Sequence, residues 1–293
     1  MISSTHEYIL FFTTRGVVYR LKGYQIPEFG RTARSTAIVN LLPLEEDEKI
    51  SAAIPVKSFD EGSYLTFVTK NGLVKRTDVT DYAKIRQGGL RAIELVDGDE
   101  LINVSLTNGE EDLLVATKKG LSIRFKETDA RAMGRTTRGV KAIELNEGDC
   151  VVSAVVAEEG KDILAVTENG YGKRTKLEEY RVQTRGGKGI FTYKLTEKTG
   201  DLIGLVSAPE ESDVMLITSD GTVIRMHVDE ISVYGRQTQG VRLMKLEPDV
   251  TTVSLALTER EEEQEIPDDA EEDAVSEENQ NEMTEEAAPD GEE

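Results

Sequence analysis

A short signature recurs five times in this chain at intervals of about fifty residues, and it constrains the fold more than any other feature. Each copy has a threonine, a glycine three residues later and an arginine four residues after the glycine. The copies are Thr13, Gly16 and Arg20; Thr69, Gly72 and Arg76; Thr117, Gly120 and Arg124; Thr167, Gly170 and Arg174; and Thr218, Gly221 and Arg225. Self-similarity at this period predicts a stacked or radial array, in which a loop of one repeat is presented again on the next.

Each repeat contains short segments rich in Val, Ile and Leu that are separated by turn residues. Asn71-Gly72, Asn169-Gly170 and Asp220-Gly221 are strong hairpin turns, because Asn and Gly tolerate the positive φ of tight turns. Helical periodicity is weak, and the segments 126–133 and 176–182 have room for a single turn only. We therefore predict an all-β, propeller-like fold of five four-stranded repeats, at about 7–56, 63–107, 112–157, 162–208 and 213–257.

The charge of the chain is unevenly distributed. The formal net charge is −21, but residues 259–293 hold 18 acidic residues and one basic residue, which leaves 38 acidic and 34 basic residues in the body. The segment 258–293 has almost no large apolar residues, so we expect a disordered acidic tail after a domain at 1–257. The tail either improves solubility or mimics nucleic acid and competes for basic loops of the body; composition does not separate these two interpretations.

The loops between the second and third strands are the strongest candidates for ligand contact. In four repeats an arginine lies fifteen residues after the turn glycine, and the surrounding loop combines cations with glycine and small hydroxyl residues. Guanidinium groups, hydroxyls and accessible backbone N–H groups are suited to phosphate. The candidate DNA-binding residues are Arg31, Arg34, Arg86, Arg91, Arg135, Arg138, Lys141, Arg185, Lys188, Arg236 and Arg242.

These loops favour a duplex backbone over exposed bases as their ligand. They contain no aromatic residue and no acid, so stacking on bases and reading of base edges are not expected. The loop of the second repeat is two residues shorter than the others, and Ser35 replaces the closing glycine in the first. The alternative for any single loop is an exposed turn with ordinary surface charge, but recurrence at one position of the repeat favours a common ligand.

The repeated threonine and strand arginine are expected to have structural roles. The threonine is suited to support the turn or to pair across strands. The arginine lies in the second strand among apolar neighbours, so packing of its aliphatic stem is at least as plausible as contact with a ligand.

Other sequence signals are negative. The single Cys150 excludes a disulfide framework, and no run of eighteen apolar residues exists, so we expect a cytoplasmic protein without a membrane partner. His6 and His227 lack partners at metal-ligand spacing, and no catalytic constellation is present. We therefore expect no catalytic residues, no metal site and no cofactor.

The repeats resemble the C-terminal DNA-wrapping domain of the DNA gyrase A subunit, from the type IIA topoisomerase family. The similarity covers residues 7 to about 257 and is strongest in 8–16, 30–34, 38–42, 167–174 and 185–189. It implies a β-pinwheel with a basic outer rim that holds duplex DNA and supports negative supercoiling by an ATP-dependent type II topoisomerase. It also implies the remaining gyrase A and gyrase B subunits as partners, and a bacterial, nucleoid-associated location.

Two departures from the family pattern qualify this resemblance. The family has six blades whereas five are counted here, and we expect the missing blade to be the first, which carries the Gln-Arg-Arg-Gly-Gly-Lys-Gly box. The similar segment 183–189 lies in the fourth repeat, so the role of the box is not transferred to it. The breakage-reunion region with its nucleophilic tyrosine is also absent. The alternatives are the DNA-geometry-sensing C-terminal domain of topoisomerase IV and a propeller-like scaffold for protein interaction.

Overall fold

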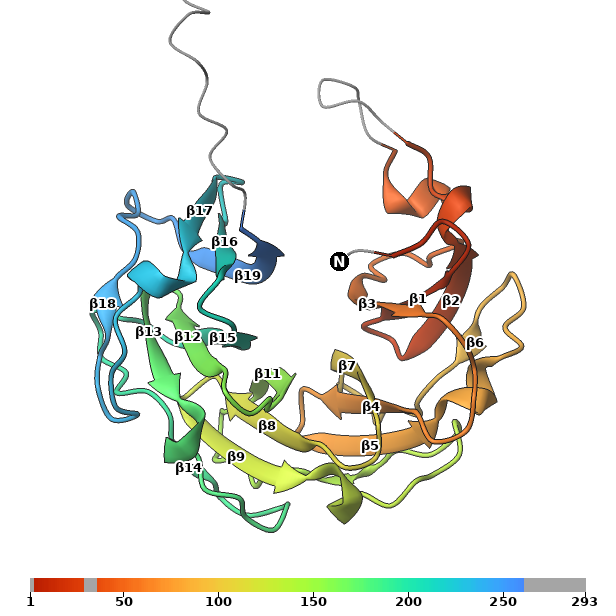
Figure 1. Ribbon diagram of the computed structural model, residues 1–293, viewed down its shortest axis with the longest axis horizontal. Helices are drawn as coiled ribbons and strands as arrows, with labels where there is room; N and C mark the ends of the chain where they lie inside the picture. The colour runs from red at the N-terminus through yellow and green to blue at the C-terminus, as the bar shows by residue number, and fades with distance from the viewer. Residues whose placement is uncertain (1–2, 29–35, 261–293) are drawn as a thin grey trace, which may run out of the picture. The chain divides into compact units, whose positions relative to one another are not determined.

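The computed structural model describes residues 3–28 and 36–260, which fold into five antiparallel sheets (Figure 1). This confirms the predicted all-β, propeller-like class. Residues 1–259 belong to one compact unit, in which the sheets follow one another as blades. Arg31 and Arg34, together with the predicted acidic tail from 261 onward, lie outside the described residues.

Four of the five blades have four strands, which run from an innermost strand to a short outermost one, and the fifth has three strands. In this order the strands are β3 (Ile50–Val56), β1 (Tyr8–Thr13), β2 (Val17–Lys22) and β6 (Leu90–Arg91); β7 (Leu101–Thr107), β4 (Tyr64–Thr69), β5 (Leu73–Asp78) and β10 (Val140–Lys141); β11 (Val151–Val156), β8 (Asp112–Thr117), β9 (Leu121–Lys126) and β14 (Ile190–Phe191); β15 (Leu202–Ala208), β12 (Asp162–Thr167), β13 (Tyr171–Lys176) and β18 (Val241–Arg242); and β19 (Thr252–Glu259), β16 (Ser212–Thr218) and β17 (Val223–His227).

The remaining regular elements are single 3₁₀ turns. They are η1 (Gly23–Gln25), η2 (Ile38–Asn40), η3 (Val79–Tyr82), η4 (Glu127–Asp129), η5 (Leu177–Glu179) and η6 (Val228–Glu230). η3 to η6 each follow the second strand of a repeat. The turns η4 and η5 lie where the sequence left room for one turn only.

The outermost strand of each four-stranded blade comes from the following repeat. β6 of the second repeat pairs with β2 of the first, and β10, β14 and β18 pair in the same way with β5, β9 and β13. The sequence predicted a third strand in each repeat but not its exchange into the neighbouring blade. The exchanged strand is short, because only two residues of it pair with the preceding blade, as Val140 and Lys141 do in β10.

Within the described residues, the fifth blade receives no exchanged strand and the first repeat supplies none. The fifth blade has three strands, because no sixth repeat follows it in the described part of the chain to supply an outermost strand. In the first repeat, η2 directly follows the position at which the later repeats form their exchanged strand, and the described residues between β2 and β3 form no strand.

Four hydrophobic clusters lie between neighbouring blades, and a fifth lies within the first repeat. Between the first two blades, Phe12 packs edge-on against Phe67 at a centroid distance of 5.5 Å, and Tyr82 closes the cluster at 6.0 Å from Phe67. Both faces of the middle strands are covered, so every residue of β12 is buried. The innermost strands pack in chain order, β3 against β7, then β11, β15 and β19. Burial on both faces of the middle strands explains why their sequences combine apolar–polar alternation with continuous apolar runs.

The glycine of the signature is the point where the following repeat docks. The carbonyl of Gly16 accepts a hydrogen bond from Ala92 N at 2.8 Å, and Gly170 O accepts one from Leu243 N at 2.8 Å. Gly72 and Gly120 make the same contact with the third and fourth repeats. At Gly170 a Cβ atom would lie 2.8 Å from the Met244 carbonyl oxygen, so the docked chain itself excludes a side chain.

The signature threonine supports the same turn. Thr69 Oγ1 accepts from Leu73 N at 3.2 Å, and Thr117 Oγ1 accepts from Leu121 N at 3.2 Å. All five signature threonines are buried. The predicted structural role of this residue is therefore confirmed.

Substitution of two equivalent glycines separates the cost of the turn from the cost of docking. Gly170 and Gly221 have φ of 73° and 88°, but a Cβ at Gly221 meets nothing within 4 Å. We expect Gly221→Ala to lower the free energy of unfolding by about 1 kcal/mol, the cost of a left-handed alanine. Gly170→Ala should cost about 3 kcal/mol, because it also displaces the docked repeat. Urea denaturation measures both values, and equal losses would contradict docking at Gly170.

Candidate nucleic-acid interface

The exchange of strands carries the loop between the second and third strands of each repeat to the outer edge of the preceding blade. Loops 134–139 and 235–240 end in β10 and β18, the outermost strands of the second and fourth blades (Figure 1). Loops 86–89 and 183–189 reach the first and third blades in the same way. The predicted loops are therefore presented along one edge, which we call the outer rim: residues 86–91, 134–141, 183–191 and 235–242.

The closing glycine of each rim loop fits against the backbone of the preceding blade. Gly139, Gly189 and Gly240 have positive φ, and a Cβ on Gly240 would lie 2.3 Å from Gly172 O. The shorter second loop closes with Gly89, which packs on the Tyr19 ring. A glycine is required at these positions because the loop backbone lies directly on the strand beneath it.

Two rim loops share a compact conformation. Both follow the pattern Gly-Arg-x-Thr, and the threonine hydroxyl donates back to the glycine carbonyl: Thr137 Oγ1 to Gly134 O at 2.9 Å, and Thr238 Oγ1 to Gly235 O at 2.8 Å. Such local hydrogen bonds hold a loop in one conformation without secondary structure. The arginine that follows the first glycine of each loop, Arg135 or Arg236, therefore starts from an ordered backbone.

The predicted DNA-binding residues within the described chain all lie on the outer rim. Six side chains are exposed and three are half-buried. The exposed ones are Arg86, Arg91, Arg138, Lys141, Lys188 and Arg242, and the half-buried ones are Arg135, Arg185 and Arg236. The structure thus brings together residues from four repeats that are about fifty positions apart in sequence.

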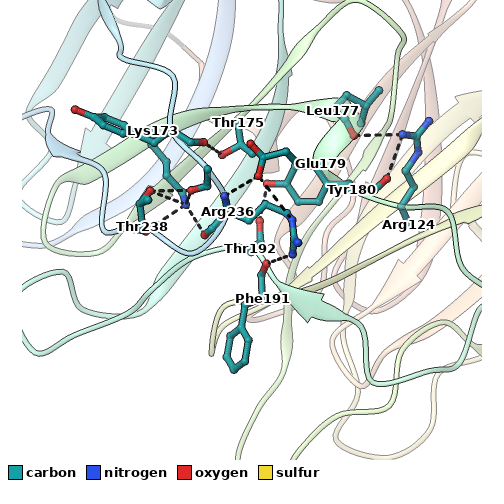
Figure 2. Close-up of polar contacts among 12 residues, drawn as sticks. Arg124, Lys173, Thr175, Leu177, Glu179, Tyr180, Phe191, Thr192, Arg236 and Thr238 are labelled. Carbon is teal, nitrogen blue, oxygen red and sulfur yellow. Dashed lines mark hydrogen bonds and ion pairs between the residues drawn. The ribbon is translucent and has the colours of Figure 1, made fainter.

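Two of the half-buried arginines hold the rim together. Arg236 donates from Nη1 to Phe191 O at 2.7 Å, and its backbone N–H donates to Glu179 Oε2 at 3.0 Å (Figure 2). Arg185 donates to Asp129 O and Lys141 O, each at 2.9 Å. Each guanidinium therefore links its loop to an adjacent segment of the preceding repeat. Their charge remains at the rim, but part of their hydrogen-bonding capacity is used within the protein.

The exposed cations have fewer protein partners. Arg138 pairs with Glu94 at 3.0 Å, and Arg242 donates to the Tyr171 hydroxyl at 3.0 Å from Nη2. In the part of the chain that the structure describes, the side chains of Arg86, Arg91 and Lys188 form no hydrogen bond or ion pair. An exposed pair such as Arg138 with Glu94 is worth little in water, so a phosphate can displace the carboxylate.

The sign of the charge beside the exchanged strands changes along the rim. The fourth residue after the start of each exchanged strand is Glu94 or Glu144 over the first two blades, and Lys194 or Lys245 over the next two. Lys194 and Lys245 are exposed cations that sequence reasoning missed. Their signal was the alignment of this position across repeats. When this position is counted together with the rim, the third and fourth blades form the more cationic half.

Phe191 is a further rim residue that the sequence reasoning missed. It occupies the position in β14 that Arg91, Lys141 and Arg242 occupy in the other exchanged strands, and its side chain is 56% exposed. It lines a shallow pocket of about 410 Å³ with Lys119, Lys194 and Gln237. The rim loops carry no aromatic residue, as expected. However, β14, which follows loop 183–189, presents the exposed ring of Phe191.

The strand arginines of the signature serve the fold, as expected. Arg20 donates to Ala83 O at 2.6 Å beside η3, and Arg174 donates from Nε to Ile231 O at 2.7 Å beside η6. Arg124 reaches Tyr180 O at 3.3 Å, and Arg76 pairs with the buried Glu127 of η4 at 3.7 Å. Each of these arginines thus holds the 3₁₀ turn of the following repeat, which confirms a structural role.

A search of protein families gives the family of this chain. The model described as "DNA gyrase C-terminal domain, beta-propeller" matches residues 7–57, 63–108, 111–158, 161–209 and 212–259. The chain belongs to this family. The matched segments coincide with the five repeats, so the predicted resemblance is confirmed.

Individual relatives agree with the family. The DNA gyrase A subunit of Halalkalibacterium halodurans is 61% identical over 244 residues, which are 83% of this chain and 29% of that relative. The solved C-terminal domain of DNA topoisomerase IV superposes with a TM-score of 0.80 at 28% identity, covering 92% of this chain and 84% of that one. A gyrase A C-terminal domain superposes at 0.76 and 26% identity, covering 87% and 83%. The chain thus spans about a third of the length of its curated relatives.

Two further findings concern the described residues. None of their helices is long and apolar enough to cross a membrane. They also contain no group of three or more His, Cys, Asp or Glu side chains placed to hold a metal ion.

Removal of the Arg174 guanidinium tests its structural role. Arg174 is buried and also pairs with Glu210 at 2.9 Å and Asp162 at 3.4 Å. We expect Arg174→Met to lower the free energy of unfolding by about 3 kcal/mol, because it leaves buried Asp162 and Ile231 O short of a donor. The matched Arg225→Met should cost less, about 2 kcal/mol, because the Arg225 side chain is more exposed than that of Arg174, although it also pairs with buried Asp213 at 2.7 Å. Thermal unfolding measures both, and a larger loss for Arg225→Met would contradict this role.

Proposed function

We propose that the chain binds duplex DNA along the outer rim by contacts to the phosphate backbone. The observation that carries this proposal is the presentation of equivalent cationic loops by four successive blades along one edge. A duplex carries negative charge at regular short intervals, so a row of cations on an extended edge gains contacts with every blade that the DNA passes. The membership of the chain in the gyrase C-terminal domain family supports DNA as the polyanion.

The proposed contacts do not read sequence. The rim offers short loops and two-residue strands, and its described residues include no helix or long ribbon that could enter a major groove. Its cations and backbone N–H groups are suited to phosphate oxygens, which position DNA but carry no base information. We therefore expect similar affinities for duplexes of different sequence.

We further propose that the bound DNA is wrapped and that wrapping serves supercoiling by DNA gyrase. In this proposal the chain has no catalysis of its own and acts with the remaining gyrase A and gyrase B subunits, in an ATP-dependent type II topoisomerase on the bacterial chromosome. The curated relatives, which are DNA gyrase A subunits, support this assignment over topoisomerase IV. Because the blades follow a curved path, DNA that contacts several of them has to bend.

Neutralisation of rim arginines should weaken DNA binding uniformly. For a random-sequence duplex of about 150 base pairs, we expect log Kd to rise linearly with log salt concentration. Arg135→Gln with Arg138→Gln should reduce the slope by about 1.8, if each arginine contacts one phosphate. Fluorescence anisotropy on two unrelated sequences measures both effects.

The control for this experiment removes two cations away from the rim. Lys57 and Lys161 follow the innermost strands β3 and β11, so Lys57→Gln with Lys161→Gln removes the same charge from elsewhere. We expect this pair to leave the salt slope unchanged. An equal effect of both pairs would show attraction by total charge only, and absence of binding at about 50 mM salt would refute the DNA proposal.

Wrapping is tested separately from binding. When nicked plasmid is sealed by ligase with the chain bound, a wrapped path should shift the mean linking number in proportion to the amount of chain added. Gel electrophoresis of the topoisomers measures the shift. Binding without any shift would contradict wrapping and leave the backbone contacts in place.

A further inference from the structure

Two lysines lie fully buried beneath the outer rim. Lys75 in β5 and Lys173 in β13 occupy the same position, three residues after the signature glycine, and both are 0% exposed. In the other repeats this position holds Tyr19, Ile123 and Ile224. A lysine in a sheet core is uncommon, because burial of an ammonium group is costly unless it is compensated.

The ammonium of Lys173 is held by the loop of the following repeat. Nζ donates to Gly235 O at 2.8 Å, to Arg236 O at 2.5 Å and to Thr238 O at 3.2 Å, as Figure 2 shows. The Thr238 hydroxyl is a further acceptor at 3.2 Å. The acceptors thus belong to the backbone that presents Arg236 and to the threonine that fixes the loop.

Lys75 makes one equivalent contact in the second blade, with the carbonyl of the rim arginine, and one contact of its own with Ala92. Nζ donates to Arg135 O at 2.6 Å and to Ala92 O at 2.6 Å. Arg135 is the counterpart of Arg236 in its loop. Each lysine therefore binds the carbonyl group of a rim arginine from below, while the arginine side chain belongs to the rim.

Neither ammonium is neutralised by a carboxylate. Within the described residues neither lysine forms an ion pair, and an aromatic ring completes each environment: Phe67 at 5.1 Å from Lys75 Nζ and Tyr193 at 4.7 Å from Lys173 Nζ. Carbonyl dipoles and ring faces stabilise a cation without cancelling its charge. The positive charge therefore remains effective at the rim loop above it.

The presence of lysine correlates with the type of loop it faces. The two lysines lie under the two described loops with the pattern Gly-Arg-x-Thr, at 134–137 and 235–238. Ile123 instead faces the loop 183–189, where its Cδ1 lies 3.7 Å from the Cβ position of Gly187, and Tyr19 faces Gly89. The lysine thus accompanies a particular loop conformation and is not a general requirement of the blade.

We propose that Lys75 and Lys173 are positioning residues of the DNA-binding rim: their buried ammonium groups fix the backbone of the two Gly-Arg-x-Thr loops and add two positive charges, which no ion pair neutralises, beneath the phosphates. This inference rests on the proposed function, and it assigns a role in DNA binding to side chains that DNA does not touch.

The charge on these lysines changes near neutral pH. Burial lowers the pKa of Lys75 to about 7, with Asp81 opposing this change and Arg135 adding to it. Burial lowers the pKa of Lys173 to about 8, opposed by Glu179 and assisted by Arg236. As the pH rises through these values, the ammonium loses its proton, one of its donors and its attraction for phosphate. DNA affinity should therefore fall between about pH 6.5 and pH 9.

Stability should change with pH in the opposite direction. The folded-state pKa of each lysine lies below its ordinary value of 10.5, so from about pH 7 upward the unfolded chain binds more protons than the folded chain. The contribution of these groups to stability therefore rises with pH up to about pH 10.5, the pKa of lysine in the unfolded chain. If the two lysines served only the fold, DNA affinity would stay constant or increase as stability rises with pH.

The test compares the full chain with Lys75→Ile and Lys173→Ile, singly and together, because Ile123 and Ile224 show that the strand position accommodates isoleucine. We measure Kd for a duplex of about 150 base pairs at about pH 6.5 and pH 9. The unaltered chain should lose about tenfold in affinity over this interval, whereas the double variant should bind about tenfold more weakly at the lower pH and show little further loss.

Arg138→Gln is the matched control. It removes an exposed rim cation and keeps both lysines, so its affinity should fall while its pH dependence remains. His6 and His227 are present in every variant.

Failure of this inference can be told apart from failure of the proposed function. If the unaltered chain binds no duplex at about 50 mM salt and either pH, both proposals are refuted. If it binds and the folded double variant keeps the same affinity or the same pH dependence, the lysine role alone is refuted. Direct titration of the lysine Nζ resonances by ¹⁵N NMR in the unaltered chain requires no variant. Midpoints near the ordinary value of 10.5 for both lysines would also refute it.

Discussion

The fold depends on one interaction, the docking of each repeat onto the turn glycine and strand arginine of the repeat before it. The glycine carbonyl receives the backbone N–H that follows the exchanged strand, as in Gly72 with Ala142, and the arginine holds the following 3₁₀ turn, as Arg174 does beside Ile231. This joint recurs wherever a following repeat exists within the described residues. The repeated spacing of threonine, glycine and arginine along the chain therefore records how blades are joined, and ligand contact is left to other residues.

The same joint positions the rim. A loop that crosses to the preceding blade is anchored at both ends, by its 3₁₀ turn before the loop and by the exchanged strand after it. Between these anchors the loop is short, and the closing glycine of loops such as 235–240 lies directly on the strand beneath. Cations are therefore displayed on an ordered backbone, which lowers the entropy lost when they bind phosphate. Damage to a joint should remove both the stability of the array and the geometry of its surface.

Local features of this fold were predictable from the sequence, and its long-range pairing was not. The hairpin at Gly170 and the apolar strands around it follow from turn chemistry within a few residues. The pairing of Val140 with Val74 joins strands from different repeats, and the same apolar pair would fit the edge of its own blade equally well. The burial of Lys75 and Lys173 was also not predictable, because a lysine in a strand usually indicates an exposed position. Their burial depends on carbonyl groups supplied by another repeat.

The exchange also explains how a nearly neutral body can present a cationic edge. Charge at the rim comes from loops that topology gathers from successive repeats, while signature arginines are neutralised inside the joints, as Arg76 is by Glu127. The net charge of the body therefore does not report the potential at its edge. Three kinds of cation contribute there: exposed side chains such as Lys188, guanidinium groups already bound to carbonyls such as Arg236, and the buried lysines. Only the first kind loses its full water shell on meeting DNA. The other two have already lost part of theirs during folding, so their attraction for phosphate is opposed by a smaller desolvation cost.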